Sequence, residues 1–435
     1  MLKVFTNAWK LPDLKRKMMF TIMILLFYRI GCVLPVPYIN TATISSWFET
    51  SAGGTMFQYL NILSGEAFSK ATLFALSVSP YITASIVMQL LTIAIPALER
   101  LQKAGEEGQK KLTQITRLVT VALALLTSFG YYTVLDNQMG AISGTGAFPV
   151  IVIVSCHCAG AALIMWLGEK INENGIGNGI SMILFANIVA SLPTLVAPFI
   201  SSLELKGVFG TILIYAGFIL FAILIVTFVV FMTNSERRLP IQYAKRVVGR
   251  KMYGGQNTFL PVKLNMSGVM PIIFANSILM LPATIAMFFP TPAEGSFWSG
   301  FLSLFTTQSL FYAVILFLLI IAFSYFYLTI SFNTVEVANN LKKNGGFIPG
   351  IRPGKPTSDF VGKVVKKITL IGAFFLGFIA VVPMLVNVVT SIFGVSLGSV
   401  TFGGTSILII VGVALEVVRD LESQITMRHY KGFLG

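Results

Sequence analysis

The residues of this chain that could bind a metal ion are badly spaced for that task. Cys156 and Cys158 flank His157 in the motif CHC. On a helix their two sulfur atoms would point about 200° apart, so one ion could not take both. The third cysteine, Cys32, lies in a different apolar segment, so the sequence shows no disulfide framework. We predict no metal site and no cofactor.

Two glycine-rich stretches resemble phosphate-binding loops without meeting their requirements. The stretch PGIRPGKPT at 349–357 ends like the pattern G-x-x-x-x-G-K-[ST], but Pro349 replaces the first glycine and Pro356 follows Lys355. Proline supplies neither a hydroxyl for magnesium nor an amide for phosphate. The stretch GIGNGIS at 175–181 follows a predicted helix rather than a strand, which indicates a tight turn and a helix start. Any energy source must therefore be another protein.

No arrangement of acids, histidines or nucleophiles indicates an enzyme. The sequence has no HExxH or GxSxG motif, and Glu106 and Glu107 lie in a charged loop. His157 has no carboxylate or nucleophile in register, and such a lone histidine is more often packed than catalytic. We predict no catalytic residues. Loss of an activity on mutating His157 would revive the alternative of a membrane enzyme.

The elements that carry these residues are membrane helices. The chain has 435 residues, of which 55% are hydrophobic and 11% charged, whereas about 25% charged residues is typical of soluble domains. A span of the hydrocarbon core needs about 20 apolar residues. Ten segments meet this requirement: 18–36, 71–96, 118–135, 148–168, 176–200, 208–232, 268–289, 309–331, 368–389 and 402–418.

The charge pattern predicts the orientation of these ten spans. With the N-terminus inside, 28 of the 31 Lys and Arg residues fall on one side. Positive loops face the cytoplasm, so both termini are predicted to be cytoplasmic. The loops at 233–267 and 332–367 are longer than a connection needs, and we expect them to dock a partner. The shorter basic clusters could instead only orient the chain and attract anionic lipids.

Two features indicate a channel with an uncharged middle. The piece 55–63 is too short to cross a membrane, and it is either an external interfacial helix or a re-entrant element inside a cavity. Aliphatic residues recur in four spans, at Ile82, Ile86, Leu184, Ile188, Ile273 and Ile409. Such residues usually pack or face lipid, but a ring of them would form a hydrophobic constriction.

Several long motifs together resemble the SecY family, the channel subunits of the bacterial Sec protein translocon. They follow one another along essentially the whole chain. They are YRIGCVLPVP (28–37), LNILSGEAFSKATLFALSVSPYITASIVMQLL (60–91), WLGEKINENGIGNGIS (166–181), YAKRVVGRKMYGGQNTFLPVKLNMSGVMPIIFANSI (243–278), NNLKKNGGFIPGIRPGKPT (339–357) and FGGTSILIIV (402–411).

The resemblance implies an all-α fold of ten transmembrane helices around an hourglass pore. Two inverted-repeat halves of five helices would span 1–205 and 206–435. A re-entrant plug helix at about 55–65 would include Met56, Phe57, Tyr59, Leu60, Ile62 and Leu63. The six aliphatic residues would form the pore ring, although Leu184 stands where an isoleucine is expected. Gln89, Thr127 and Asn276 would form hydrogen bonds across a lateral gate.

The resemblance also implies a function and partners. The chain would translocate unfolded secretory proteins across the bacterial plasma membrane and release transmembrane segments sideways into lipid. It would assemble with SecE and SecG, recognise signal sequences and nascent chains, and dock SecA or the ribosome with its rRNA. The docking residues would be Arg352, Lys245, Arg246, Arg250 and Lys251.

A secondary transporter is the other alternative. It would also contain broken helices, but it needs charges or coordinating oxygens near the midplane. These spans offer mainly Gln89, Asn187, Asn276 and Asn387. Ion-coupled uptake of a small solute into proteoliposomes would favour that class.

Overall fold

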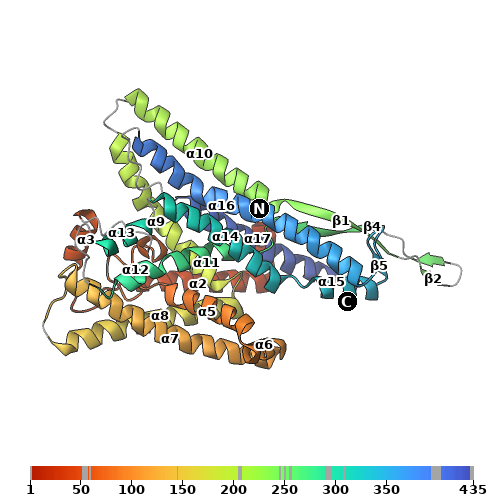
Figure 1. The fold of residues 1–435 in the computed structure, drawn as a ribbon, viewed down its shortest axis with the longest axis horizontal. Helices are drawn as coiled ribbons and strands as arrows, with labels where there is room; N and C mark the ends of the chain where they lie inside the picture. Colours follow the sequence, from red (N-terminus) through yellow and green to blue (C-terminus); the bar gives the residue numbers. More distant parts are fainter. Residues whose placement is uncertain are drawn as a thin grey trace.

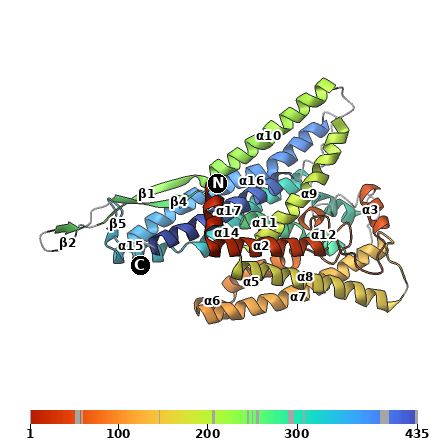
Figure 2. The same ribbon diagram turned by 180° about the vertical axis from the view of Figure 1, so that it is seen from behind.

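The chain forms an elongated bundle of helices with a strand-rich projection at one end (Figures 1 and 2). The computed structural model describes residues 2–50, 57, 60–144, 146–203, 208–243, 246–248, 251–253, 257–289, 296–306, 309–392 and 403–431. In both views α5, α7 and α8 lie together on one side, and α10 and α16 on the other. Helix α3 lies at the end opposite to the strands.

The first half of the chain contributes helices from both the apolar and the polar stretches of the sequence. They are α1 (Leu2–Lys10), α2 (Pro12–Gly31), α3 (Thr41–Thr50), α5 (Ser79–Ala94), α6 (Pro96–Lys103), α7 (Glu106–Asn137), α8 (Ala147–Asn174) and α9 (Gly179–Leu203). The turn predicted at 175–181 is confirmed, because α9 begins at Gly179 and Gly177 has a φ of +72°. The Asn178 side chain accepts from the Ile180 amide at 3.1 Å and so caps α9.

The second half of the chain has more breaks. Its helices are α10 (Val208–Asn234), α11 (Met270–Leu279), α12 (Leu281–Ala286), α13 (Phe297–Leu304), α14 (Leu310–Ser331), α15 (Thr334–Lys343), α16 (Lys355–Ile392) and α17 (Gly403–Lys431). The predicted span 268–289 is therefore divided between α11 and α12, and Pro282 follows directly after the start of α12.

Within the described residues, four helices are long and apolar enough to cross a membrane. They are Glu106–Gln138, Ala147–Asn174, Leu310–Lys343 and Lys355–Val386. The pair α5 and α6 would make a fifth, although it is bent by 101° at Ile95, directly before Pro96. Shorter apolar helices cover Gly179–Thr194, Ala222–Asn234 and Met270–Ala286. The chain is thus a multi-pass membrane protein.

The described chain is mostly helical, as predicted, and short strands in the long loops are the exception to the predicted all-α fold. A three-stranded antiparallel sheet has the order β4-β1-β5, built from β1 (Glu236–Tyr243), β4 (Asn257–Lys263) and β5 (Gly346–Phe347). Its register pairs Leu239 with Leu260, and Gln242 with Phe347. Strands β2 (Arg246–Val248) and β3 (Lys251–Tyr253) form a separate hairpin. Outside the hydrocarbon, water satisfies the open sheet edges that lipid would not tolerate.

The two long loops pack on each other around a small core of their own. Leu239 and Ile241 alternate with exposed residues along β1, as expected for a strand with one buried face. Leu239 and Val262 pack with Ile348 and Val361. Much of the predicted loop 332–367 is helix, because α15 and the start of α16 lie within it. Its non-helical part is residues 344–354, which include β5.

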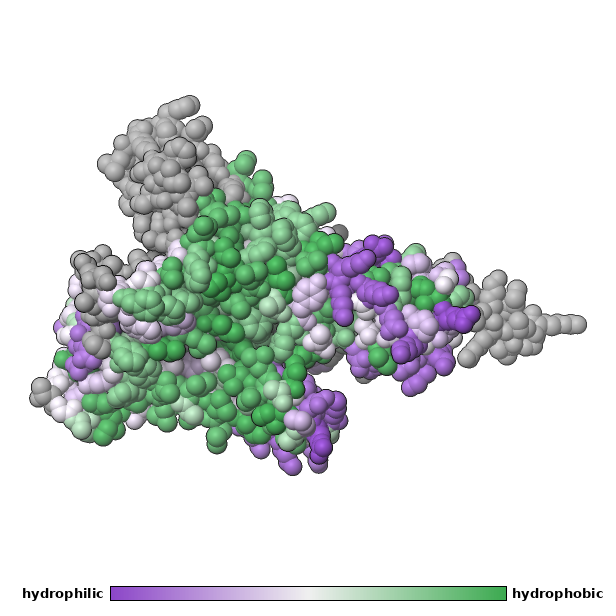
Figure 3. Space-filling model, in the orientation of Figure 1, coloured by the Kyte–Doolittle hydropathy of each residue, from purple (hydrophilic) through white to green (hydrophobic). Residues whose placement is uncertain are grey.

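The predicted second span, 71–96, begins later than expected. Residues 64–78 form successive turns, and α5 starts only at Ser79. Ala71 and Ser77 have positive φ values of 43° and 51°, which a membrane helix cannot contain. A space-filling view shows an apolar body, with hydrophilic residues gathered near the strands and near α6 (Figure 3).

Candidate functional site

The six aliphatic residues that were predicted to form a pore ring all lie in one hydrophobic cluster. Ile82 and Ile86 come from α5, Leu184 and Ile188 from α9, Ile273 from α11 and Ile409 from α17. None is more than 5% exposed. Residues as far apart in the sequence as Ile82 and Ile409 are thus brought together in one apolar cluster.

A cavity of about 180 Å³ adjoins this cluster. Its walls come from α5 and α7 on one side and from α11 and α12 on the other, and we call this boundary the gate. The lining includes Ile82, Leu184, Ile273 and Ile409, and also Leu60 and Leu63 of the predicted plug. The lining is almost entirely apolar, so the cavity suits a hydrophobic segment better than an ion.

Part of the predicted plug can be described. Phe57 and residues 60–63 are helical, whereas Met56 and Tyr59 lie outside the described residues. Phe57, Ile62 and Leu63 are at most 8% exposed. Ile62 and Leu63 pack in the same cluster as the six aliphatic residues. The short helix is therefore seated inside the protein, which removes the alternative of an external interfacial helix.

The carbonyl groups at the end of this helix are held by polar side chains of α9. The Asn187 amide donates to Leu63 O at 2.7 Å, to Ser77 Oγ at 3.1 Å and to the Tyr28 hydroxyl at 2.9 Å. The Ser191 hydroxyl lies 3.3 Å from Ile62 O and donates to it. Asn187 is fully buried, so these contacts are made without competing water.

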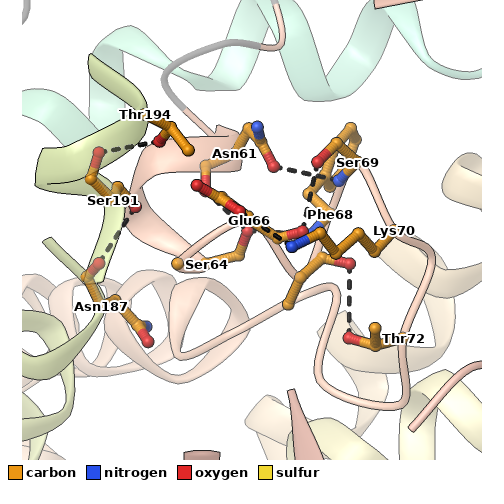
Figure 4. A network of polar contacts seen from close by, with 12 residues as sticks. Asn61, Ser64, Glu66, Phe68, Ser69, Lys70, Thr72, Asn187, Ser191 and Thr194 are labelled. Atoms are coloured by element: carbon orange, nitrogen blue, oxygen red, sulfur yellow. Dashed lines mark hydrogen bonds and ion pairs between the residues drawn. The ribbon is translucent and has the colours of Figure 1, made fainter. Parts of the chain in front are cut away.

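The segment that follows the plug, residues 64–78, is fixed by its own network (Figure 4). The Asn61 side chain accepts from the Ser69 amide at 3.0 Å, and the Phe68 amide donates to Ser64 Oγ at 3.0 Å. Glu66 adopts a φ of 69° and pairs with Lys70 at 2.9 Å. A non-glycine residue in this region persists only where its surroundings hold it.

The charges of this network are arranged to keep Glu66 ionised. Burial by itself raises the pKa of the Glu66 carboxyl, but the neighbouring Thr194 hydroxyl and the Lys70 ammonium outweigh it and hold the pKa below its ordinary value. The Arg29 guanidinium acts in the same direction, and it donates to Gly65 O at 3.1 Å. Arg29 therefore binds the segment that follows the plug helix.

The three residues that were predicted to bond across the gate do not do so in this structure. The Gln89 amide donates to Ser85, the Thr127 hydroxyl to Leu123 O and the Asn276 amide to Ile272 O, each on its own helix. A polar side chain in an apolar helix finds the carbonyl one turn earlier more readily than a partner on another helix.

A different residue forms the hydrogen bond across the gate. The hydroxyl of Thr133, on α7, lies within hydrogen-bond distance of Met287 O, just after the end of α12, and also of Gly130 O on its own helix at 2.7 Å. Sequence reasoning missed Thr133 because Thr in a helix usually bonds its own backbone, and nothing in the local sequence shows which neighbour it faces.

An aromatic cluster beside the plug was also missed. Rings of Trp47 and Phe48 from α3 contact Phe57 and Phe68, and Phe68 in turn lies 4.6 Å from the Tyr131 ring. Aromatic residues occur throughout these apolar segments, so their sequence positions carry no signal of this contact.

His157 has a packing role in the structure. Its Nδ1 lies 2.9 Å from Ile153 O, and its ring meets the Tyr131 ring edge to face at 5.1 Å. In the described part of the chain, no group of three His, Cys, Asp or Glu residues could hold a metal ion.

The predicted docking residues that the structure describes lie at the strand-rich end. Arg352 is exposed in the turn between β5 and α16, where Gly350 and Gly354 have φ values of +80° and +103°. Arg246 and Lys251 lie in β2 and β3. Lys245 and Arg250 fall outside the described residues. On β4, burial and the nearby Arg419 guanidinium lower the pKa of Lys263.

Comparison with known proteins decides the family. The family model described as SecY matches residues 72–418. The chain belongs to the SecY family. It is 42% identical over 449 residues to the protein translocase subunit SecY of Mycobacterium tuberculosis, with 100% of both chains covered. The same identity and coverage relate it to the protein translocase subunit SecY of Streptomyces coelicolor.

Solved structures of low sequence identity share the SecY fold. A structure described as that of a protein conducting channel matches with a TM-score of 0.64 and 18% identity, covering 96% of both chains. Sec61 in the canine ribosome-channel complex matches with a TM-score of 0.58 and 16% identity, again over 96% of both chains.

Proposed function

We propose that this chain is the channel subunit of a protein translocase. It moves unfolded secretory proteins across the membrane and releases apolar segments into the bilayer, and other proteins supply the energy. The observation that carries this function is the buried cluster of Ile82, Ile86, Leu184, Ile188, Ile273 and Ile409 beside a seated short helix. Family membership supports it independently.

The six aliphatic residues act as the pore ring. A ring of bulky apolar side chains closes to water and ions, yet it offers no specific binding group to a passing chain. Leu184 keeps this property, since it is as apolar as an isoleucine. Phe57, Leu60, Ile62 and Leu63, with Met56 and Tyr59, form the plug on the outer side of the ring. No charged side chain is present among the described residues that line the adjoining cavity, which argues against ion-coupled transport.

The gate between α5 and α7 on one side and α11 and α12 on the other admits the signal sequence. Its walls are apolar along the cavity, so a hydrophobic helix gains free energy by entering. Opening shifts a closed population rather than breaking a strong interaction, because hydrogen bonds between membrane helices contribute only about 0.6–2 kcal/mol each. Gln89, Thr127 and Asn276 lie on these gate helices with their side chains bonded locally, and we keep them as residues that could exchange partners during opening.

The number of spans, their internal repeat and their orientation are proposed from membership of the SecY family. Ten spans form two inverted-repeat halves, 1–205 and 206–435, around an hourglass pore. The basic loops and both termini face the cytoplasm of a bacterial cell, and the channel lies in the plasma membrane. The gathering of hydrophilic residues near the strands and α6 supports this orientation (Figure 3).

The partners follow from the missing energy source and the basic surface. SecE and SecG complete the membrane complex, and anionic lipids surround its basic side. SecA or the ribosome docks on Arg352 and on Lys245, Arg246, Arg250 and Lys251, where positive charge suits acidic protein surface or rRNA phosphate. Solved ribosome complexes of Sec61 and of yeast Ssh1 have related folds, which supports the ribosome as a partner.

Photo-crosslinking tests the proposed path. Crosslinkers at Ile86 and Ile273 are combined with a secretory chain that is stalled midway. We expect adducts from both positions, and from neither when the chain lacks its signal sequence. A crosslinker at Phe311, which is exposed on α14, serves as the control. Absence of adducts at both ring positions would refute the assignment of these residues to the pore.

A further inference from the structure

One turn of α7 contacts both the opposite wall of the gate and the segment that holds the plug. Phe129, Gly130, Tyr131 and Thr133 make or permit these contacts, and we call these four residues the coupling turn. Its neighbours across the gate are Met287 and Phe288, and its neighbour in the plug segment is Phe68.

The contacts across the gate are close. Thr133 Oγ1 donates to Met287 O, and the rings of Phe129 and Phe288 lie 6.5 Å apart. A methyl group at Gly130 would come within 2.9 Å of the Phe288 ring. Glycine at this position therefore allows the two walls to meet, and their separation must break the Thr133 hydrogen bond.

The contact with the plug segment is made by the next side chain. The Tyr131 hydroxyl donates to Phe68 O at 2.6 Å, and the two rings lie 4.6 Å apart. Both residues are at most 1% exposed. Phe68 also stacks on Phe57 of the plug helix at 5.9 Å. A displacement of Phe68 would therefore also displace Phe57 of the plug helix.

An α-helix turns by about 100° per residue, so Gly130 and Thr133 share one face while Tyr131 points to a second face. Because the turn is hydrogen-bonded internally, both faces move together when α7 moves. We propose that the coupling turn links gate opening to plug release, with Tyr131 as the positioning residue. This inference rests on the gate and plug assigned under the proposed function.

The plug is held from the other side by a different helix. Asn187 and Ser191 of α9 bind Leu63 O and Ile62 O, and they make no contact with the gate wall at Met287 or Phe288 among their hydrogen bonds. We therefore assign α9 the role of a fixed anchor and α7 that of the moving contact. Removal of an α9 contact loosens the plug, whereas removal of the Tyr131 hydroxyl also disconnects it from the gate.

The test uses Tyr131→Phe, which removes one hydroxyl and keeps the ring. Tyr132→Phe is the matched control, because Tyr132 is the neighbouring tyrosine and its hydroxyl lies 3.4 Å from Asp136 Oδ2 rather than near the plug. Each variant is purified as the assembled complex with its small membrane subunits. Spin labels at Leu125→Cys and Phe289→Cys, both exposed positions, report the gate separation after the three native cysteines are replaced by alanine. Ion conductance in planar bilayers reports plug release.

A synthetic signal peptide should widen the gate and raise the conductance of the native channel. In Tyr131→Phe the gate should widen as before, but the ratio of conductance with and without peptide should fall by about three- to tenfold, as expected for one buried hydrogen bond. Tyr132→Phe should match the native protein. Thr133→Val should raise the resting conductance in the native background and raise it less in the Tyr131→Phe background.

The possible outcomes distinguish failure of the proposed gate and plug from failure of the coupling turn alone. A native channel whose gate and conductance ignore the peptide overturns the proposed gate and plug themselves. A native channel that responds, with Tyr131→Phe responding to the same extent, overturns the coupling turn alone. Equal losses in Tyr131→Phe and Tyr132→Phe would also overturn it, because the effect would then belong to α7 in general.

Discussion

Replacement of Asn187 by leucine should unlock the plug without unfolding the channel. The Asn187 amide contacts Leu63 O at 2.7 Å, Tyr28 Oη at 2.9 Å and Ser77 Oγ at 3.1 Å. Leucine has the same branched skeleton and cannot donate, so all three interactions are lost with little change in the shape of the side chain. Of the three Asn187 contacts, only the one with Leu63 O joins the plug helix to α9, and Ser191 keeps a second such contact, with Ile62 O.

The size of the effect follows from that contact. A net hydrogen bond contributes about 0.5–1.5 kcal/mol, and interhelical hydrogen bonds in membranes average about 0.6 kcal/mol. Loss of about 1 kcal/mol from the closed state multiplies the open-to-closed ratio about fivefold. Leu63 O keeps its contact with the Ser77 hydroxyl at 3.1 Å, so the loss should not be much larger.

Single-channel recording of the purified complex measures this change. We expect the resting open probability of Asn187→Leu to rise about fivefold, whereas Ser181→Ala, on the same helix at a buried hydroxyl away from the plug hydrogen bonds, should leave it unchanged. Thermal unfolding measured in parallel establishes that the variant is folded. An unchanged resting open probability in a folded Asn187→Leu channel would refute the anchoring role.

Three further outcomes are expected. Arg352→Glu should nearly abolish SecA-driven export in a vesicle assay while thermal unfolding stays unchanged, because charge reversal repels an acidic docking surface; normal export would contradict the docking assignment. Ile86→Ser should wet the ring and raise the resting ion leak at least severalfold, with Val87→Ser, at a 38% exposed neighbour, as the control; equal leaks from both would argue against the ring. The pKa of Glu66 is lowered in the folded protein, so its stabilising contribution is present above the ordinary pKa of about 4.3 and is lost as the external pH falls through the lowered value. The leak should therefore rise at acidic external pH and lose this dependence in Glu66→Gln, which a pH titration of the conductance checks.

Hydropathy alone predicted the helical body, because each membrane helix must satisfy its own backbone and so leaves a long apolar run in the sequence. The strands β1 and β4 were not predicted, since ERRLPIQY and NTFLPVK carry charges and prolines that suggest loops. Their pairing depends on contacts between distant segments, such as Gln242 with Phe347. The start of α5 was misplaced for a related reason. The turns at 71–78 are held by partners from other helices, and Ser77 keeps its positive φ with Asn187 beside it.

Some of the site residues could be named from the sequence, and others were found only in the structure. Ile82, Ile86, Leu184, Ile188, Ile273 and Ile409 were named from the family resemblance, and the structure places all six in one buried cluster. Thr133 and Tyr131 were not named, because their importance lies in partners that are more than sixty residues away, Met287 and Phe68. Arg29 likewise binds Gly65 O, a partner that its own helix does not specify.

The sequence by itself determined that this chain is a multi-pass membrane protein without its own catalytic chemistry, since composition and charge act on each segment independently of its neighbours. Its motifs, read together, also determined the family. Only the tertiary structure decided which polar groups meet inside the apolar body. A buried donor in a membrane must find an acceptor, and local sequence does not specify whether that acceptor lies one turn away, as for Asn276, or on a different helix, as for Asn187. That choice separates a helix that merely packs from one that holds the plug.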